Sequence, residues 1–455
     1  MTHKFDFIQS LFLVGFLLLV IFLTMNMFGK GPHLALTLCL GIVSMTGYYK
    51  KHSWKSMITF MFQGLRKCSA AIFILGLIGT LIGIWMMSGT VPTIFYFGLK
   101  IISPQWFLPS CLLLTILVSS FTGSALTTVG TVGVALMGIA QGFGIPAPHT
   151  AGAVICGACF GDKVSPLSDT TNFAPAVVGV DLFAHIEHLL GTTIPALVLT
   201  FIFFIYLSHG DFSHSQTVVH NILLSLESSF NISILTLISP LIITSLAMMR
   251  FPTIPILSFG VVTGLLTAGF VQSNWDISQW LVVLLKGFSD QSGNHIVDNI
   301  VNRGGLSSML FSISLIVVAL CLGGLLQSFG VIISLMEGLK GKVRKRGAIV
   351  SCTAASSIGV NFLTGEQYLS ILLPGQAFKA LYQEQKIATK TLSRTLEDAG
   401  TLVNPLVPWG VSGTFFANAL HVPVSQYIPF VVFLYLSPLF TIAFAYLPER
   451  AKNRN

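Results

Sequence analysis

The sequence predicts an all-α polytopic membrane protein with roughly ten to twelve transmembrane segments, inverted-topology repeats, and broken helices or re-entrant hairpins. Composition is the first reason: 53% of the residues are hydrophobic and only 9% are charged, whereas a soluble domain carries about 25% charged residues. Mean hydropathy is +0.82. Long uncharged runs and an internal repeat are the second and third reasons.

Eight apolar runs approach the roughly 20 residues that a helix needs to cross a bilayer. They are Phe7–Phe28, His33–Tyr49, Ser69–Met87, Phe107–Ser120, Leu189–Leu207, Ile232–Met249, Leu306–Gln327 and Tyr427–Leu447. Shorter apolar pieces raise the expected number of crossings to ten to twelve.

Lys and Arg gather at three places, within residues 50–67, 340–346 and 450–454. Loops rich in Lys and Arg face the cytoplasm, so all three clusters and both termini are expected there, in a multi-pass protein of the bacterial plasma membrane. The formal net charge of +8 then reflects topology and attraction to anionic lipid, and gives no reason to invoke nucleic acid.

Short matches recur in the same order at an offset of about 240 residues, which favours an internal duplication. The pairs are Gly98-Leu-Lys100 with Gly338-Leu-Lys340, Ser119-Ser120 with Ser356-Ser357, Thr127 with Thr364, Gly138 with Gly375, and Gly161–Leu167 with Gly400–Leu406. The first copy reaches an uncharged loop where the second reaches its basic cluster, so equivalent points fall on opposite sides of the membrane. This pattern predicts an inverted repeat with a central site.

The repeat divides the chain into five parts. We expect N-terminal helices over residues 1–60, the first repeat over 61–207, a connecting loop over 208–230, linking helices over 231–300, and the second repeat over 301–455.

A dense polar cluster over residues 161–175 lies between runs with almost no charge. Charged groups at bilayer depth line a polar cavity or pair with one another, so an ion or substrate site is expected. Pro166 and Pro175 interrupt the helical hydrogen bonds of this segment, and Pro405 and Pro408 do the same in the second repeat. The freed backbone groups must find partners in protein, water or a bound ion.

A small hard cation prefers oxygen ligands, some of them anionic. The candidate ion-binding or proton-binding residues are Asp162, Ser165, Ser168, Asp169, Thr170, Thr171, Asn172, Glu366, Thr401 and Asn404. Candidate substrate or charge partners are Lys163, Arg394, Glu397 and Asp398. A buried carboxylate that accepts either a cation or a proton would by itself give exchange.

Structural roles stay open for several of these residues. Asp162 and Lys163 could form a pair that stabilises the break, and residues 170–172 could cap a helix. Glu366 could anchor a helix at the membrane interface. Glu397 and Asp398 could form an ion pair with Arg394.

The segment Gly161–Ala176, followed by Asp181-Leu-Phe-Ala-His185-Ile, resembles the signature of the NhaC sodium/proton antiporter family within the ion transporter superfamily. Leu392–Thr401 and Pro405-Leu-Val-Pro-Trp409 are similar to that family's second signature, although Ala399 stands where Ser is common and Gly410-Val-Ser412 replaces a polar Asn-Thr-Cys. The resemblance covers roughly residues 60–447. These departures leave the fold expectation intact but alter which second-repeat oxygens can reach the ion.

The resemblance implies a secondary antiporter that exchanges cytoplasmic Na⁺ for external H⁺ by alternating access, with Na⁺, H⁺ and the lipid bilayer as partners. The family also includes sodium-coupled exchangers of malate with lactate, so an organic-acid substrate is the alternative. Self-association is left open. Neither a serine-nucleophile elbow nor a phosphate-binding loop occurs, which argues against an enzyme or an ATP-driven pump, and no cofactor or resident metal is expected.

Overall fold

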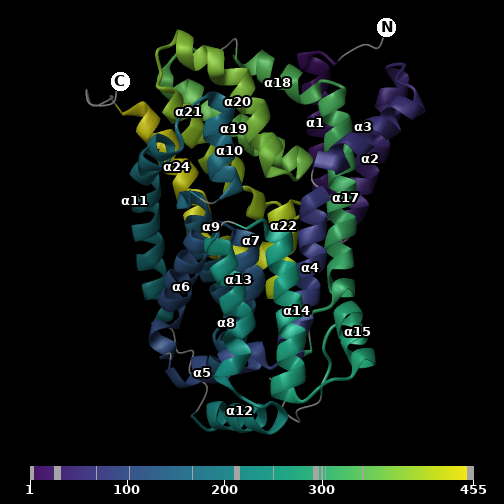
Figure 1. The fold of residues 1–455 in the computed structure, drawn as a ribbon. Helices are drawn as coiled ribbons and strands as arrows, with labels where there is room; N and C mark the ends of the chain where they lie inside the picture. The colour runs from purple at the N-terminus through teal and green to yellow at the C-terminus, as the bar shows by residue number, and fades with distance from the viewer. Residues whose placement is uncertain are drawn as a thin grey trace.

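The computed structural model is helical throughout the residues that it describes, which are 5–24, 32–67, 69–101, 103–166, 168–209, 216–249, 251–290, 297–298, 301–302, 304–340 and 343–447. No strand occurs among them. Most of the long helices run up and down in one elongated bundle (Figure 1). The N-terminal helices are α1 (Phe7–Phe22), α2 (Pro32–Tyr49) and α3 (Trp54–Lys67).

The two repeats contain matching series of helices. The first consists of α4 (Ser69–Met87), α5 (Thr90–Ile101), α6 (Phe107–Thr122), α7 (Ala125–Thr128), η3 (Val129–Gly133), α8 (Val134–Phe143), α9 (Ala147–Val164), α10 (Asp169–Val178) and α11 (Leu182–Ser208). The second consists of α17 (Leu306–Ser328), α18 (Val331–Lys340), α19 (Arg346–Thr364), α20 (Gln367–Glu384), α21 (Thr389–Leu396), η5 (Glu397–Thr401), η6 (Asn404–Leu406), α22 (Val411–Leu420), α23 (Val424–Tyr427), η7 (Ile428–Phe430) and α24 (Val432–Tyr446).

Residues with a left-handed backbone conformation at the helix ends support this match. The pairs are Gly89 with Gly330, Gly123 with Gly365, Gly144 with Lys386, and Gly179 with His421, each separated by 241 or 242 positions. A left-handed residue ends a helix by turning the chain, so the two copies turn at the same places.

The residue pairing within the repeat needs a correction. Thr122 ends α6 as Thr364 ends α19, an offset of 242. The predicted pairings of Thr127 with Thr364, of Ser119-Ser120 with Ser356-Ser357 and of Gly138 with Gly375, all at an offset of 237, are therefore wrong. The offset taken from the sequence was too short here. Single Ser, Thr and Gly residues are common enough to match at several offsets, whereas the ends of the helices define one alignment of the two repeats.

The two copies have opposite orientations, as the charges predicted. In Figure 1, α4 descends from α3 to α5 at the lower end, whereas α17 ascends to α18 at the upper end. The start of α1 and the end of α24 also lie at the upper end. Arg344 and Lys345, which precede α19, are therefore at the same end as these two helix ends.

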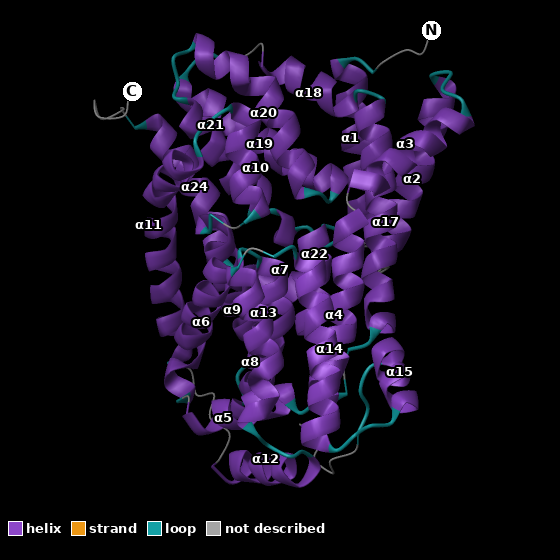
Figure 2. Ribbon diagram, viewed as in Figure 1, coloured by secondary structure: helices purple, strands orange, loops and turns teal. Residues whose placement is uncertain are grey.

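Six helices are long and apolar enough to cross a membrane, or nine if each of three sharply bent pairs is one crossing, among the described residues. This number is below the expected ten to twelve for two reasons. Half-length helices such as α10 and α22, which begin at mid-height (Figure 2), are too short, and 18-residue helices such as α9 are not apolar enough.

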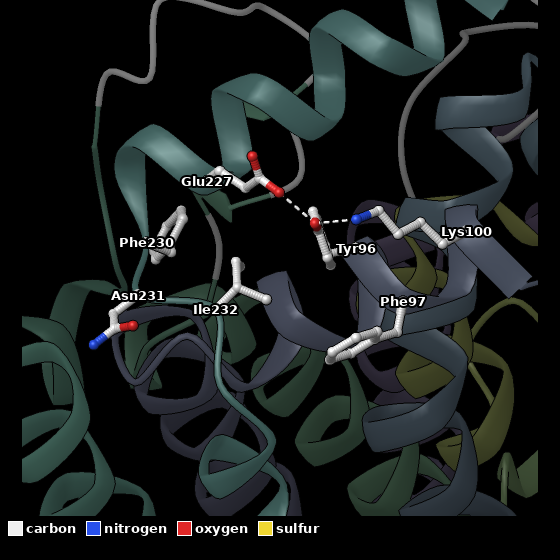
Figure 3. A pocket seen from close by; sticks show the side chains of 7 residues that line it. All are labelled: Tyr96, Phe97, Lys100, Glu227, Phe230, Asn231 and Ile232. Atoms are coloured by element: carbon white, nitrogen blue, oxygen red, sulfur yellow. Dashed lines mark hydrogen bonds between the residues drawn. The ribbon is translucent and has the colours of Figure 1, made fainter.

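The connection between the repeats begins with α12 (Gln216–Ser229), which lies across the lower end (Figure 1). Tyr96 on α5 donates a hydrogen bond to Glu227 on α12 and accepts one from Lys100 (Figure 3). These residues line a cavity of about 450 Å³. The helices η4 (Ile234–Leu237), α13 (Ile238–Met248), α14 (Thr253–Gln272) and α15 (Ile277–Lys286) then lead to the second repeat.

Two glycines let α9 pack closely against α6. Gly157 and Gly161 are four residues apart on one face of α9, the small-residue spacing that allows close helix packing in membranes. A Cβ atom on Gly161 would lie 2.5 Å from the carbonyl oxygen of Ile116 and 2.7 Å from the backbone nitrogen of Ser120. The position of the polar end of α9 therefore depends on these glycines.

We predict that Gly161→Ala lowers the thermal unfolding temperature in detergent, because backbone atoms of α6 would have to move. Overpacking of this kind costs about 1–3 kcal/mol. Gly191→Ala on α11 is the matched control, since a Cβ atom there meets nothing within 4 Å. Equal unfolding temperatures for the two variants would contradict the packing argument.

Candidate functional site

The helix break in the first repeat lies between α9 and α10, at mid-height in the bundle (Figure 2). The hydroxyl of Thr171 donates to the carbonyl oxygens of Asp162 and Lys163, at 3.1 and 3.0 Å. The side-chain amide of Asn172 donates to the carbonyl oxygens of Pro166 and Ser168, at 2.8 and 2.7 Å. These side chains replace the helical hydrogen bonds that the break removes.

The break in the second repeat is longer and starts with a π-helical turn, η5, which follows α21 directly. Such turns insert a residue into a helix and often occur at functional sites. Asn361 on α19 donates to the Gly400 carbonyl and, at 3.1 Å, to Ser370 on α20. The π turn is thereby held against two neighbouring helices.

The side chain of Asn404 forms hydrogen bonds that hold neighbouring segments of the second repeat together. Its amide nitrogen donates to Asn361 and to the Gly365 carbonyl, at 2.9 and 3.0 Å. Its oxygen accepts from the backbone nitrogen of Ser412, at 2.8 Å, in the first turn of α22. Contact of Asn404 with an ion stays an untested prediction, and these bonds favour a structural role.

Lys163 and Asp398 form an ion pair between the two breaks, and neither side chain is exposed to solvent. It is the only ion pair found among the described residues. Asp398 also accepts hydrogen bonds from Ser437 at 2.9 Å, from Thr192 at 3.2 Å and from Thr441, and Lys163 donates to Ser437 at 2.6 Å. The pair therefore joins α9, η5, α11 and α24.

Two sequence expectations are corrected by this pairing. Asp162 does not pair with Lys163, and Arg394 forms no ion pair with Glu397 or Asp398 within 4 Å in the described part of the chain. Adjacency in sequence did not predict the ion-pair partner, because the side chain of Lys163 reaches Asp398 in the other repeat.

Glu397 differs from Asp398 in its surroundings. It is fully buried, and neither of its carboxylate oxygens has a hydrogen-bond partner among the described residues. Its neighbours are Asp162, Lys163, Thr170 and Thr401. The hydroxyl of Thr401 is likewise buried without a partner.

Three carboxylates form a series from the surface to the interior. Asp169 is exposed and accepts a hydrogen bond from Tyr368, at 3.4 Å. Asp162 is half-buried and lies beside Asp169, the Ser168 hydroxyl and the backbone nitrogen of Ala125. Asp162 also neighbours Glu397, so the three carboxylates lie in the order Asp169, Asp162, Glu397 from the exposed residue to the fully buried one.

The other predicted residues lie around this series. Ser165 donates to the Ser120 carbonyl at 2.7 Å. Glu366 caps α20 by accepting from the backbone nitrogen of Leu369 at 2.8 Å, and Ser168 caps α10. Arg394 is 5% exposed, and its Nε has no partner among the described residues.

Several polar residues of the site were not predicted, namely Tyr368, Asn361, Ser370, Thr192, Ser437 and Thr441. Most are lone hydroxyls or amides in apolar helices, where a hydroxyl commonly bonds to its own backbone. One signal was available: Ser437 and Thr441 are four residues apart on a helix that otherwise contains no polar side chain but Tyr.

Comparison with known proteins gives concordant matches. The profile of the Na⁺/H⁺ antiporter family matches residues 157–447. The Na⁺/H⁺ antiporter NhaC of Alkalihalophilus pseudofirmus is 53% identical over 438 residues, which are 96% of this chain and 95% of that protein. The chain belongs to the Na⁺/H⁺ antiporter family.

Other relatives of this antiporter have similar lengths. The NhaC antiporter of Bacillus subtilis is 43% identical, with 98% of this chain and 99% of that protein covered. The malate-2H⁺/Na⁺-lactate antiporter of the same species is 32% identical, with 91% and 88% covered. These three relatives are named as antiporters, and the present chain is likewise a transporter and not an enzyme.

We predict that the single variants Lys163→Gln and Asp398→Asn each destabilise the antiporter by about 3–5 kcal/mol, because each leaves one buried charge without its partner. The double variant should regain most of this loss, since it leaves no charge. Thermal unfolding of the four proteins in detergent measures the coupling. If the effects of the two single variants simply add in the double variant, the pair is not an energetic unit.

Proposed function

We propose that this antiporter exports cytoplasmic Na⁺ in exchange for external H⁺ across the bacterial plasma membrane. Membership of the Na⁺/H⁺ antiporter family and the NhaC relatives at 53% and 43% identity support this activity. The upper end of the bundle in Figure 1 faces the cytoplasm in this proposal, because Arg344 and Lys345 lie there.

The observation that carries the proposed site is the buried carboxylate of Glu397, whose two oxygens lack a hydrogen-bond partner among the described residues. An isolated carboxylate in a low-dielectric interior is costly, so it must be neutralised by a proton or a cation. Lys163 cannot fully neutralise Glu397, because Lys163 is paired with Asp398. Glu397 is thus the centre at which Na⁺ and H⁺ compete.

Hydroxyl and carboxylate oxygens near Glu397 provide the remaining ligands in this proposal. Thr170 comes from the first repeat and Thr401 from the second, and Asp162 adds a second carboxylate. Oxygen ligands of this kind replace the water that a hard cation gives up. Asp169 would attract the ion at the open side, since it is the exposed member of the series.

Alternating access follows from the inverted repeats. A site shared by two copies of opposite orientation can open to either side when one copy moves against the other. Since Glu397 must be neutral whenever it is enclosed, each passage carries Na⁺ in one direction or H⁺ in the other. The proton gradient then supplies the driving force.

An organic-acid exchanger is the second candidate, favoured by the malate/lactate relative at 32% identity. A carboxylate substrate would need a cationic group. Lys163 is committed to Asp398, and Arg303 lies outside the described residues. Arg394, with its buried unpartnered Nε, is the remaining candidate.

We predict that Glu397→Gln abolishes Na⁺-dependent proton movement in everted vesicles, because an amide carries no negative charge that Na⁺ or H⁺ could neutralise. Asp162→Asn should weaken the response to Na⁺ by at least tenfold, the effect of losing about 1.4 kcal/mol. Proton movement is read from the dequenching of a pH-sensitive dye when NaCl is added.

Glu384→Gln is the matched control for this experiment, since Glu384 is an exposed residue at the end of α20. It should respond to NaCl like the wild type. Adding malate and lactate on opposite sides tests the second candidate. A response that requires both acids, and that is lost in Arg394→Gln but kept in Glu397→Gln, would replace the first proposal by the second.

A further inference from the structure

A cavity of about 600 Å³ lies at the turn between α2 and α3, away from the carboxylate series. It is lined by Tyr48, Tyr49, Lys51, His52 and Ser53. The turn lies at the upper end of the bundle, and α3 extends downward from it beside α17 (Figure 1).

The polar groups of this cavity suit an anion. Lys51, which lines the cavity, and Lys55, four residues further along the chain, are exposed, and neither forms an ion pair among the described residues. The sequence from Phe7 to Gly161 contains no Asp or Glu. Asp6 is near the turn, because Phe5 and Gln9 contact Lys50, but its carboxylate caps α1 by accepting from the backbone nitrogen of Gln9. His52 is 8% exposed, and its buried Nε2 has no hydrogen-bond partner in the described residues.

An apolar stripe continues from the cavity along α3. Trp54, Ile58 and Phe62 are spaced four residues apart and are 55%, 50% and 65% exposed. Tyr48 stacks on Trp54 with ring centroids 5.9 Å apart. Aromatic rings at the headgroup level are typical of membrane interfaces, and residues four apart share one face of a helix.

We propose that this turn binds one anionic phospholipid. Its phosphate lies between Lys51 and Ser53, and its acyl chain follows the Trp54–Phe62 stripe toward the bilayer centre. The combination of a basic headgroup site with an apolar stripe on the same helix distinguishes a lipid from a free anion. The nearby Lys50 is engaged elsewhere, because it donates to Gln9 and lies over the ring of Phe5, 4.8 Å from its centroid.

The test is native mass spectrometry of the full chain released from vesicles of equal parts phosphatidylglycerol and phosphatidylcholine. The wild type should retain phosphatidylglycerol selectively. Lys51→Gln/Lys55→Gln should reduce this selectivity by about fivefold for each lysine, the effect of about 1 kcal/mol per charge near a membrane surface. Lys286→Gln/Lys386→Gln, which removes two exposed lysines elsewhere, is the matched control.

Unchanged selectivity in the Lys51→Gln/Lys55→Gln variant, or an equal loss in the control, would overturn the proposal. Excess inorganic phosphate, compared with chloride at the same ionic strength, forms the second arm. If inorganic phosphate displaces phosphatidylglycerol, the cavity takes a free anion and the lipid proposal fails. Because these substitutions lie on an exposed surface, they should leave the thermal unfolding temperature nearly unchanged, so the variants remain comparable.

Discussion

The buried ion pair between Lys163 and Asp398 is the constraint on which the arrangement of the site depends. Each charge would be costly alone at this depth, and a buried pair is tolerated only when its remaining hydrogen bonds are satisfied. Hydroxyls of Thr192, Ser437 and Thr441 meet this condition for Asp398. Helices from both repeats are thereby held around one point.

This constraint gives two adjacent carboxylates different roles. Asp398 faces Lys163 and the three hydroxyls, whereas Glu397 has no hydrogen-bond partner in the described part of the chain. In a regular α-helix, consecutive side chains already point in different directions. The π turn that begins at Glu397 changes the helical register there, so the chain can present Glu397 to the proposed ion site and Asp398 to Lys163 and the three hydroxyls.

Much of the fold could be predicted from sequence because lipid imposes strong rules. Apolar runs, basic clusters and an ordered repeat predicted an all-α membrane protein with inverted copies, and the polar cluster at residues 161–175 marked one helix break. It was harder to predict which residues of one repeat pair with residues of the other. Asp398 and Lys163 are 235 positions apart, and nothing in either neighbourhood shows that they meet.

The second break also explains why the repeat was misaligned near the site. The first break has only residues 165–168 between α9 and α10, whereas residues 402–410 separate η5 from α22. The sequence match of Gly161–Leu167 with Gly400–Leu406 follows the shared Val-Xaa-Pro-Leu. The helix ends instead give an offset of 242, which places Pro166 opposite Pro408. The two copies have equal lengths here, because α9 and α10 start 22 residues apart, as do α21 and α22. A local motif therefore dominated the comparison where the two copies differ in how far the first helix continues.

In the proposed function, the formal charges show why Glu397 needs a counter-ion. Lys163 and Asp398 neutralise each other as an ion pair. Glu397 is fully buried, and neither of its carboxylate oxygens has a hydrogen-bond partner among the described residues. Its negative charge is therefore left over at this depth, and Na⁺ or a proton would neutralise it. On the proposed function, the exchange of Na⁺ for H⁺ follows from enclosing a carboxylate that the surrounding protein leaves without a partner.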